Sequence, residues 1–345
     1  MVELWFALVC LLLAAYATLD GFDLGVGIVH RVLGRTPEER AQTLATIGPF
    51  WDGNEVCLIA AGGTLFLAFP AALASALSGF YLAIFMLLWS LLGRGLSIEL
   101  RQHVNDPLWI AFWDTAFSVC STLLAFLLGV AFANLVRGVP LREDGFFTLQ
   151  LFTTFMPRGE VGLLDWYTVL SGVFTTVALA VHGCLYLAWK ADEALAVRAH
   201  RLARRLALAA IPLFGALSVA TFWLRPDMGR ALAHRPLGWL ALAALVGSAG
   251  TLAWSLRTRA DRRTFLASSA LIVSVVAATA TAVFPIMLAS THDAPPLDAY
   301  TAAAPDSSLR AAAYWWPAAA LLAVGYFTIL FRHHRGRLQA LAHDE

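Results

Sequence analysis

Residues 1–33 of the chain read MVELWFALVCLLLAAYATLDGFDLGVGIVHRVL, and this stretch decides the fold. Two acids, Asp20 and Asp23, interrupt a run that is otherwise almost wholly apolar. A helix crosses a bilayer with about 20 mostly apolar residues, so the run is long enough to span one. It lacks the basic segment and the small-residue cleavage site of a signal peptide. We therefore expect a retained membrane helix.

The composition of the whole chain agrees with that expectation. Of 345 residues, 59% are hydrophobic and 14% are charged, and the mean hydropathy is +0.70. Soluble domains carry about 25% charged residues, so a soluble enzyme, a disordered chain and a nucleic-acid-binding protein are excluded. The net charge of +1 indicates no polyanionic partner. The cysteines lie singly in apolar runs, which indicates buried side chains and neither disulfides nor a metal site. They are Cys10, Cys57, Cys120 and Cys184.

Apolar segments of bilayer-spanning length recur along the sequence, separated by short connections. They predict an all-α, polytopic bundle of about nine transmembrane helices, forming a single integral membrane domain over residues 1–345. No internal repeat and no fused soluble domain is apparent. The expected spans are roughly 3–33, 48–70, 76–98, 114–136, 163–189, 206–224, 236–256, 264–288 and 313–332.

The basic residues predict the direction of the chain through the membrane. Most of the 24 Lys and Arg residues follow odd-numbered spans, Arg94 among them, and fewer follow even-numbered spans. Cytoplasmic loops are the ones enriched in Lys and Arg. We therefore expect a periplasmic N-terminus and a cytoplasmic C-terminus.

Four carboxylates lie where an apolar span is expected. Asp20 and Asp23 belong to the first span, and Asp52 and Glu55 lie near the start of the second. A carboxylate inside a span costs about 2.5–3.5 kcal/mol on insertion scales and usually marks a functional path or a buried pair. The predicted direction places Asp52 about one turn in from the cytoplasm, Glu55 one turn deeper, and Asp23 in the inner half. The sequence thus predicts a proton path through Asp52, Glu55 and Asp23.

The structural alternative is an ion pair. Asp20 or Asp23 would then pair with Arg94, or with a basic residue of a neighbouring subunit, and serve assembly alone. Asp114 is expected to open the fourth span from the cytoplasmic side, among the same acidic groups.

Candidate redox ligands are few. His182 is the one histidine expected deep in a span, and Met86 is the one mid-membrane methionine that could partner it. A lone histidine is more often a hydrogen-bonded core residue, so we expect no haem or metal ligand in this chain. Trp51 could belong to the aromatic belt of the membrane interface.

Several motifs resemble subunit II of the cytochrome bd-type quinol oxidases, including their cyanide-insensitive relatives. DGFDxGVG together with WDGNxV is the specific pair of signatures, and the matching stretches follow the family's order over nearly the whole chain. The stretches are LDGFDLGVG (19–27), GPFWDGNEVCLIAAGGTLFLAFP (48–70), SGFYLAIFMLLWSLLGR (78–94), WDTAFSV (113–119), GVAFANLVRGVPL (129–141) and TAVFPIMLAS (281–290).

The resemblance implies a subunit of a respiratory complex in the bacterial cytoplasmic (inner) membrane. Such a complex oxidises ubiquinol at the outer face and reduces O2 to water with cytoplasmic protons. Its b-type haems and d-type haem are held by subunit I, so this chain would have no catalytic residue and no activity alone. The implied partners are subunit I, membrane lipid and quinone, without nucleic acid. The resemblance leaves open whether a small single-helix subunit joins them.

Two residues of the second span carry family roles by resemblance. Asp52, in WDGN, matches the proton-route carboxylate, and Trp51 matches a residue beside a bound quinone in some members. Cys57 departs from the family, which often has Trp there, and this puts the quinone site in doubt. A secondary transporter using the same acids for ion coupling is the alternative function, although no second copy of the DGFD and WDGN pattern occurs. A third alternative is a purely structural scaffold for the partner.

The basic-residue pattern makes a testable prediction about topology. Reporter fusions after Arg205 and Arg263 should report a cytoplasmic position, and a fusion near Arg142 should report a periplasmic one. Phosphatase and fluorescent-protein fusions at each position provide the measurement. Opposite results at two of these positions would overturn the predicted orientation.

Overall fold

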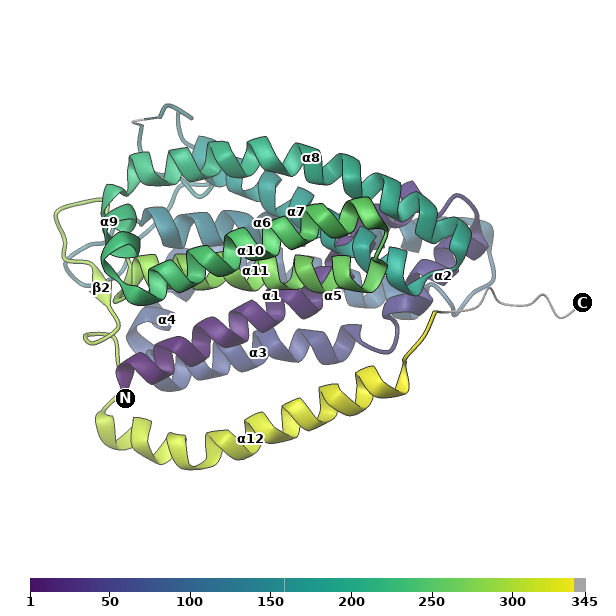
Figure 1. Cartoon of the computed structure of the whole chain (residues 1–345). Coiled ribbons are helices and arrows are strands. Elements are labelled where there is room, and N and C mark those ends of the chain that lie inside the picture. The colour runs from purple at the N-terminus through teal and green to yellow at the C-terminus, as the bar shows by residue number, and fades with distance from the viewer. Residues whose placement is uncertain (158, 338–345) are drawn as a thin grey trace, which may run out of the picture.

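A computed structural model describes residues 1–157 and 159–337 of the chain, which fold mainly into helices, and the longest of these run along a common direction (Figure 1). One short antiparallel pair of strands completes the structure. The elements in chain order are α1 (Val2–Leu33), α2 (Pro37–Ile47), α3 (Trp51–Ala68), α4 (Pro70–Gly79), α5 (Tyr81–Leu100), α6 (Pro107–Arg137), α7 (Trp166–Lys190), α8 (Glu193–Leu224), α9 (Pro226–His234), α10 (Pro236–Thr258), α11 (Asp261–Val283), β1 (Ile286–Leu288), β2 (Leu297–Asp298) and α12 (Asp306–His333).

Each of the nine expected spans corresponds to a long helix, which confirms the all-α membrane bundle. Within the described residues, eight helices are individually long and apolar enough to cross a membrane. The ninth is α3, which qualifies only together with α4, and the two are bent by 120° at Phe69. The polar residues Asp52, Asn54 and Glu55 at the start of α3 explain why it falls short alone.

Several helix boundaries differ from those expected. The fourth span begins at Pro107 and not at 114, because Asp106 caps it by accepting hydrogen bonds from the amides of Leu108 and Trp109. The sixth begins at 193 and not at 206, because Asp192 caps a polar but helical segment.

The eighth expected span, 264–288, is also shorter than predicted. Helix α11 ends at Val283, two residues before Pro285, and the residue before a proline disfavours helical dihedrals. The following residues form β1, whose Ile286 and Leu288 pair with Asp298 and Leu297 of β2.

The end of the bundle that carries the β strands is closed by polar contacts. Arg137 at the end of α6 pairs with Asp165, which caps α7. Arg225 donates to both carboxylate oxygens of Asp227 at the start of α9, at 2.9 and 2.7 Å. These hydrogen bonds hold the pKa of Asp227 below its usual value. The N-terminus lies at this end, and α2 and the last described residues lie at the other (Figure 1).

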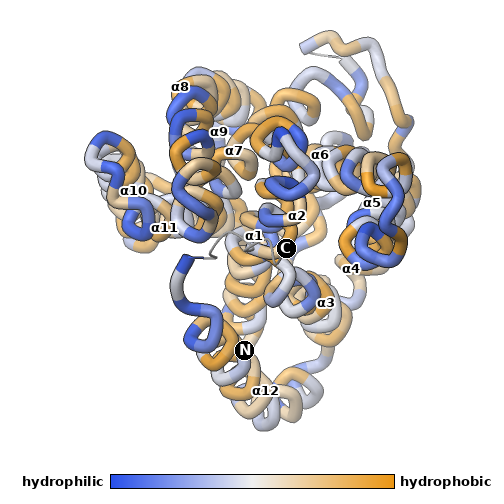
Figure 2. The backbone as a smooth tube through the Cα atoms, turned by 90° about the vertical axis from the view of Figure 1, so that its right-hand side faces the viewer, coloured by the Kyte–Doolittle hydropathy of each residue, from blue (hydrophilic) through white to orange (hydrophobic). Residues whose placement is uncertain are grey.

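Helix α1 lies at the centre of the bundle when it is viewed end-on (Figure 2). Residues 20–27 of α1 are all buried, whichever way they face. Gly25 meets Gly183 of α7 backbone to backbone: a Cβ atom on Gly25 would lie 2.6 Å from the Gly183 nitrogen. Only glycine permits this approach, so the two helices touch at that point.

Helix α12, by contrast, stands apart from the other helices along much of its length (Figures 1 and 2). Near its start Leu309 and Ala312 pack in the cluster around Trp5 of α1. Near its end Phe331 stacks on Phe50, with ring centroids 4.8 Å apart. Between these contacts its side chains are largely exposed in the chain.

The contact between α1 and α7 gives a prediction about stability. Gly25→Ala should lower the free energy of unfolding by about 1–3 kcal/mol, because the added Cβ atom forces the two helix backbones apart. Gly250→Ala in α10 is the matched control, since a Cβ there meets nothing within 4 Å. Thermal unfolding in detergent would compare the two, and equal stabilities would contradict the proposed contact.

Candidate functional site

The guanidinium group of Arg94 in α5 lies at the middle of a buried ionic cluster. Its Nη1 donates to Oδ1 of Asp20 at 2.6 Å, and its Nη2 donates to Oε1 of Glu55. Asp20 and Arg94 are fully buried, whereas the side chain of Glu55 is 25% exposed. One side chain of α5 therefore joins α1 and α3 through charge-assisted hydrogen bonds.

Asp23 belongs to the same region but has a different partner. The side-chain amide of Asn54 donates to Oδ2 of Asp23 at 2.7 Å and to the Leu19 carbonyl at 3.3 Å. Asp23 is 1% exposed, and Asn54 is fully buried. Asp20 thus faces Arg94, and Asp23 faces α3 through an amide.

The cluster has more hydrogen-bonding capacity than it uses. Of the buried polar atoms that have no partner among the described residues, five belong to side chains in or beside the cluster. They are Oη of Tyr16, Oδ2 of Asp20, Oδ1 of Asp23, Oδ1 of Asn54 and Nε of Arg94. Buried polar groups of native proteins are nearly always paired with protein or water. These atoms therefore mark a place where water can be bound.

Asp52 occupies a different environment from the one expected. It lies in the first turn of α3, is exposed, and makes no hydrogen bond or ion pair with any described residue. The sequence predicts Asp52 about one turn inside the span, but the helix starts only at Trp51, so Asp52 lies in its first turn. Trp51 is half-buried, and its ring lies against Gly95 of α5. Cys57 is buried one turn beyond Asn54.

Arg94 does not lie in a cytoplasmic loop, where the pattern of basic residues predicts it. It lies inside α5 and is fully buried. The Gly-Arg-Gly sequence at 93–95 resembles a helix end, and only the tertiary pairing with two carboxylates makes it a core residue.

Asp114 forms a second buried cluster nearer the α2 end of the bundle. It does not open the fourth span, since α6 begins at Pro107 and Asp114 lies about two turns inside. Its carboxylate accepts from Nε2 of His30 at 3.0 Å, from Nε of Arg40 at 2.6 Å and from Nε of Arg101 at 2.5 Å. This cluster ties α1, α2, α5 and α6 together.

His30 was missed as a core residue. The sequence places it four residues before Gly34, where it looked like a helix-end histidine, but it is fully buried. Its Nδ1 lies 2.5 Å from the hydroxyl of Thr43, which itself donates to the Arg40 carbonyl. No local sequence pattern predicts this burial, because the partners of His30, Thr43 and Asp114, lie far from it in the sequence.

His182 makes two hydrogen bonds within the bundle. Its Nε2 donates to the Thr18 carbonyl at 3.0 Å, and the Ser268 hydroxyl donates to its Nδ1 at 2.7 Å. Both ring nitrogens of His182 are hydrogen-bonded within the protein, so neither is free to bind a haem iron. Within the described ranges, no group of three or more His, Cys, Asp and Glu side chains could hold a metal ion.

Comparison with known proteins assigns the family. The family model described as "Cytochrome bd terminal oxidase subunit II" matches residues 1–334. The chain belongs to this family. It is therefore a multi-pass protein of the bacterial inner membrane and a member of a respiratory oxidase complex. This membership argues against the alternative function as a secondary transporter.

Two relatives and one solved structure show the extent of the similarity. The "Cytochrome bd ubiquinol oxidase subunit 2" of Bacillus subtilis is 33% identical over 313 residues, which cover 89% of this chain and 88% of that protein. The "Cytochrome bd-I ubiquinol oxidase subunit 2" of Escherichia coli K12 is 36% identical over 216 residues, 63% and 56% of the two chains. The bd oxidase structure from Geobacillus thermodenitrificans shares the fold, with a TM-score of 0.72 and 17% identity over 96% and 97% of the chains.

The Arg94 cluster gives a prediction about assembly of this subunit. Arg94→Gln should destabilise the protein by about 3–5 kcal/mol, because it leaves two buried carboxylates without their cation. Adding Asp20→Asn should restore part of that loss, since one uncompensated charge is removed. Thermal unfolding and subunit yield provide the measurement.

The matched control is the exposed pair between Arg310 and Asp306 on α12, joined at 2.7 Å. Arg310→Gln should cost less than about 1 kcal/mol, because water solvates both partners. An Arg94→Gln protein as stable as the Arg310→Gln protein would show that the cluster contributes nothing to the fold.

Proposed function

We propose that this chain is the second subunit of a quinol:O2 oxidoreductase, inactive alone, and that it carries protons from the cytoplasm toward the partner. The path begins at Asp52, continues through Glu55 and ends in the cluster of Asp20, Asp23 and Arg94. The observation that carries the proposal is the gradation in exposure. Asp52 is exposed, Glu55 is 25% exposed, and Asp20 and Asp23 are almost completely buried.

The spacing of these carboxylates supports the order of transfer. Asp52 and Glu55 are separated by three residues of α3, so their side chains are neighbours on the helix surface. Glu55 and Asp20 both contact the Arg94 guanidinium. A proton that reaches Glu55 is then one residue away from the buried carboxylates of α1.

The charge of the cluster supports proton exchange at the buried end of the proposed path. Asp20, Asp23 and Glu55 could carry three negative charges, but within the described structure Arg94 is the one cation that contacts any of them, and it contacts only Asp20 and Glu55. Uncompensated charges are costly in the membrane interior. Binding a proton removes that cost, and the unpartnered carboxylate oxygens of Asp20 and Asp23 are available to accept one.

Asn54 has a positioning role in this proposal. It donates to both Asp23 and the Leu19 carbonyl, which fixes the Asp23 carboxylate against α3. An amide does not titrate in this range, so Asn54 orients the inner station without holding the proton itself.

Family membership supports a proposal for the cofactors and the remaining partners of the complex. The b-type and d-type haems would be held by subunit I, in keeping with the two engaged nitrogens of His182. Ubiquinol is the proposed electron donor, as in the names of the relatives from B. subtilis and E. coli. Trp51 remains the proposed quinone-adjacent residue. A small single-helix subunit is a further candidate partner.

Replacement of Asp52 tests the path. Asp52→Asn should slow O2 consumption by the assembled complex at least about tenfold, because the amide has nearly the same shape but cannot release and regain a proton. Oxygen uptake with a quinol donor provides the measurement, with haem content and subunit ratio determined on the same sample.

Glu99→Gln is the matched control, since Glu99 is also an exposed acid at the same end of the bundle. It should leave turnover unchanged. Near-normal turnover of an assembled Asp52→Asn complex would refute the path, and loss of haem or of subunit I would support the scaffold alternative instead.

A further inference from the structure

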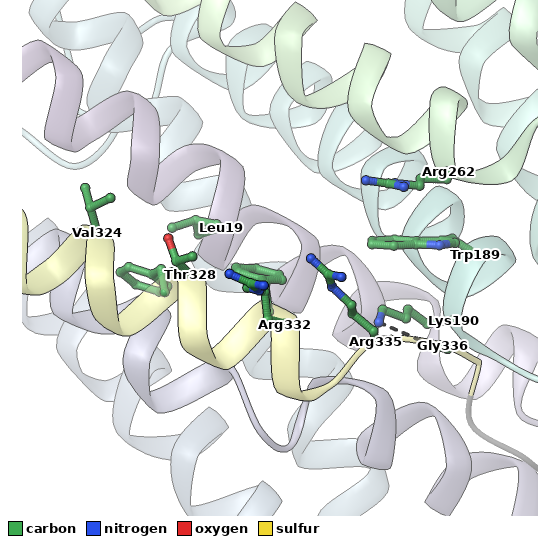
Figure 3. A pocket seen from close by; sticks show the side chains of 11 residues that line it. Leu19, Trp189, Lys190, Arg262, Val324, Thr328, Arg332, Arg335 and Gly336 are labelled. Carbon is green, nitrogen blue, oxygen red and sulfur yellow. Dashed lines mark hydrogen bonds between the residues drawn. The ribbon is translucent and has the colours of Figure 1, made fainter.

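A cavity of about 900 Å³ lies between α12 and the rest of the bundle (Figure 3). Its apolar wall is formed by Leu19 of α1, Trp189 of α7, and Val324, Phe327 and Phe331 of α12. A second cavity of about 260 Å³ adjoins it and shares Leu19, Trp189 and Phe331 with it. Together they form an apolar groove that branches toward α11.

Basic side chains line the same cavity at one end. Arg262, Arg332 and Arg335 are exposed there and form no hydrogen bond or ion pair with any described residue. The nearby acidic side chains pair with Arg337 and not with these three arginines: Arg337 lies 2.8 Å from Glu193 and 3.0 Å from Asp261. No acidic side chain is among the lining residues.

A fourth basic residue, Lys190, helps to close the basic end of the groove. Its Nζ donates to the His334 carbonyl at 2.6 Å and to the Gly336 carbonyl at 3.3 Å, and it lies 4.6 Å from the centre of the Trp189 ring. Lys190 thus anchors the segment after α12 and adds positive charge beside the arginines (Figure 3).

The basic residues lie at helix ends. Arg262 belongs to the first turn of α11, Arg332 to the last turn of α12, and Lys190 is the last residue of α7. Ends of spanning helices lie at the level of the lipid headgroups, and basic pockets between such helices bind anionic headgroups. Apolar walls below a basic rim fit a molecule with hydrocarbon chains and one anionic head.

We propose that this groove binds one anionic phospholipid. Its phosphate lies among Arg262, Arg332 and Arg335, and its acyl chains fill the two apolar cavities. Three unpaired guanidinium groups favour a phosphodiester over a neutral headgroup or a neutral quinone ring, because only an anion compensates their charge. The lipid would bridge α12 to α1, α7 and α11 across the groove that separates them.

The test uses the purified two-subunit complex in nanodiscs of phosphatidylcholine with or without phosphatidylglycerol. Lipid that stays bound after transfer to detergent is counted by native mass spectrometry, and the Tm is measured in both lipids. Arg262→Gln/Arg332→Gln/Arg335→Gln should retain phosphatidylglycerol at least about tenfold more weakly than the wild type. The rise in Tm that phosphatidylglycerol gives the wild type should be lost.

The matched control is Arg204→Gln/Arg257→Gln/Arg263→Gln, which removes three exposed arginines that do not line the cavity. It should retain the lipid. A second variant, Thr328→Trp, fills the cavity while keeping every charge and should also displace the lipid. The proposal is overturned if both cavity variants retain phosphatidylglycerol, if the wild type does not prefer it to phosphatidylcholine, or if quinone is the molecule they lose.

Discussion

The rest of the structure depends on the buried guanidinium group of Arg94. A cation at this depth is stable only when carboxylates surround it, and carboxylates at this depth need a cation in turn. Asp20 and Glu55 meet that need from two other helices. Because a one-residue slip of α1, α3 or α5 would separate the charges, the cluster fixes the axial register of these three helices. Apolar packing alone specifies register far less sharply in a membrane.

Ionic clusters occur at three levels of the bundle, and each fixes the position of the helices that it joins. Asp114 gathers His30, Arg40 and Arg101 near the α2 end, and Arg137 pairs with Asp165 at the opposite end. The Arg94 cluster lies between them along α1 and α5. The three clusters differ in charge balance. Asp114 has two arginines and a histidine, whereas Arg94 is paired with two carboxylates and has a third, Asp23, nearby.

The sequence predicted the spans well, but of the buried polar contacts it suggested only the pairing of Asp20 with Arg94, and this difference has a physical reason. Hydrophobic length is a local property, so nine helices could be recognised without knowing their neighbours. Burial of a charge is a tertiary property. Arg94 looked like a loop residue and His30 like a helix end, because what buries them comes from helices far away in the sequence. Polar helical extensions, such as the start of α8 at Glu193, carry no apolar signal and were missed.

The position of α12 connects the proposed proton entrance with the groove. The α12 residues that line the groove recur at helical spacing and so share one face: Val324, Phe327, Thr328, Phe331, Arg332 and Arg335. Tyr326 falls on the opposite face, and its hydroxyl would lie 2.8 Å from a Cβ atom on Gly53. Gly53 follows Asp52 directly, so α12 passes beside the first turn of α3 because residue 53 has no side chain. Any molecule that holds α12 against the bundle therefore also fixes the surroundings of the exposed carboxylate of Asp52.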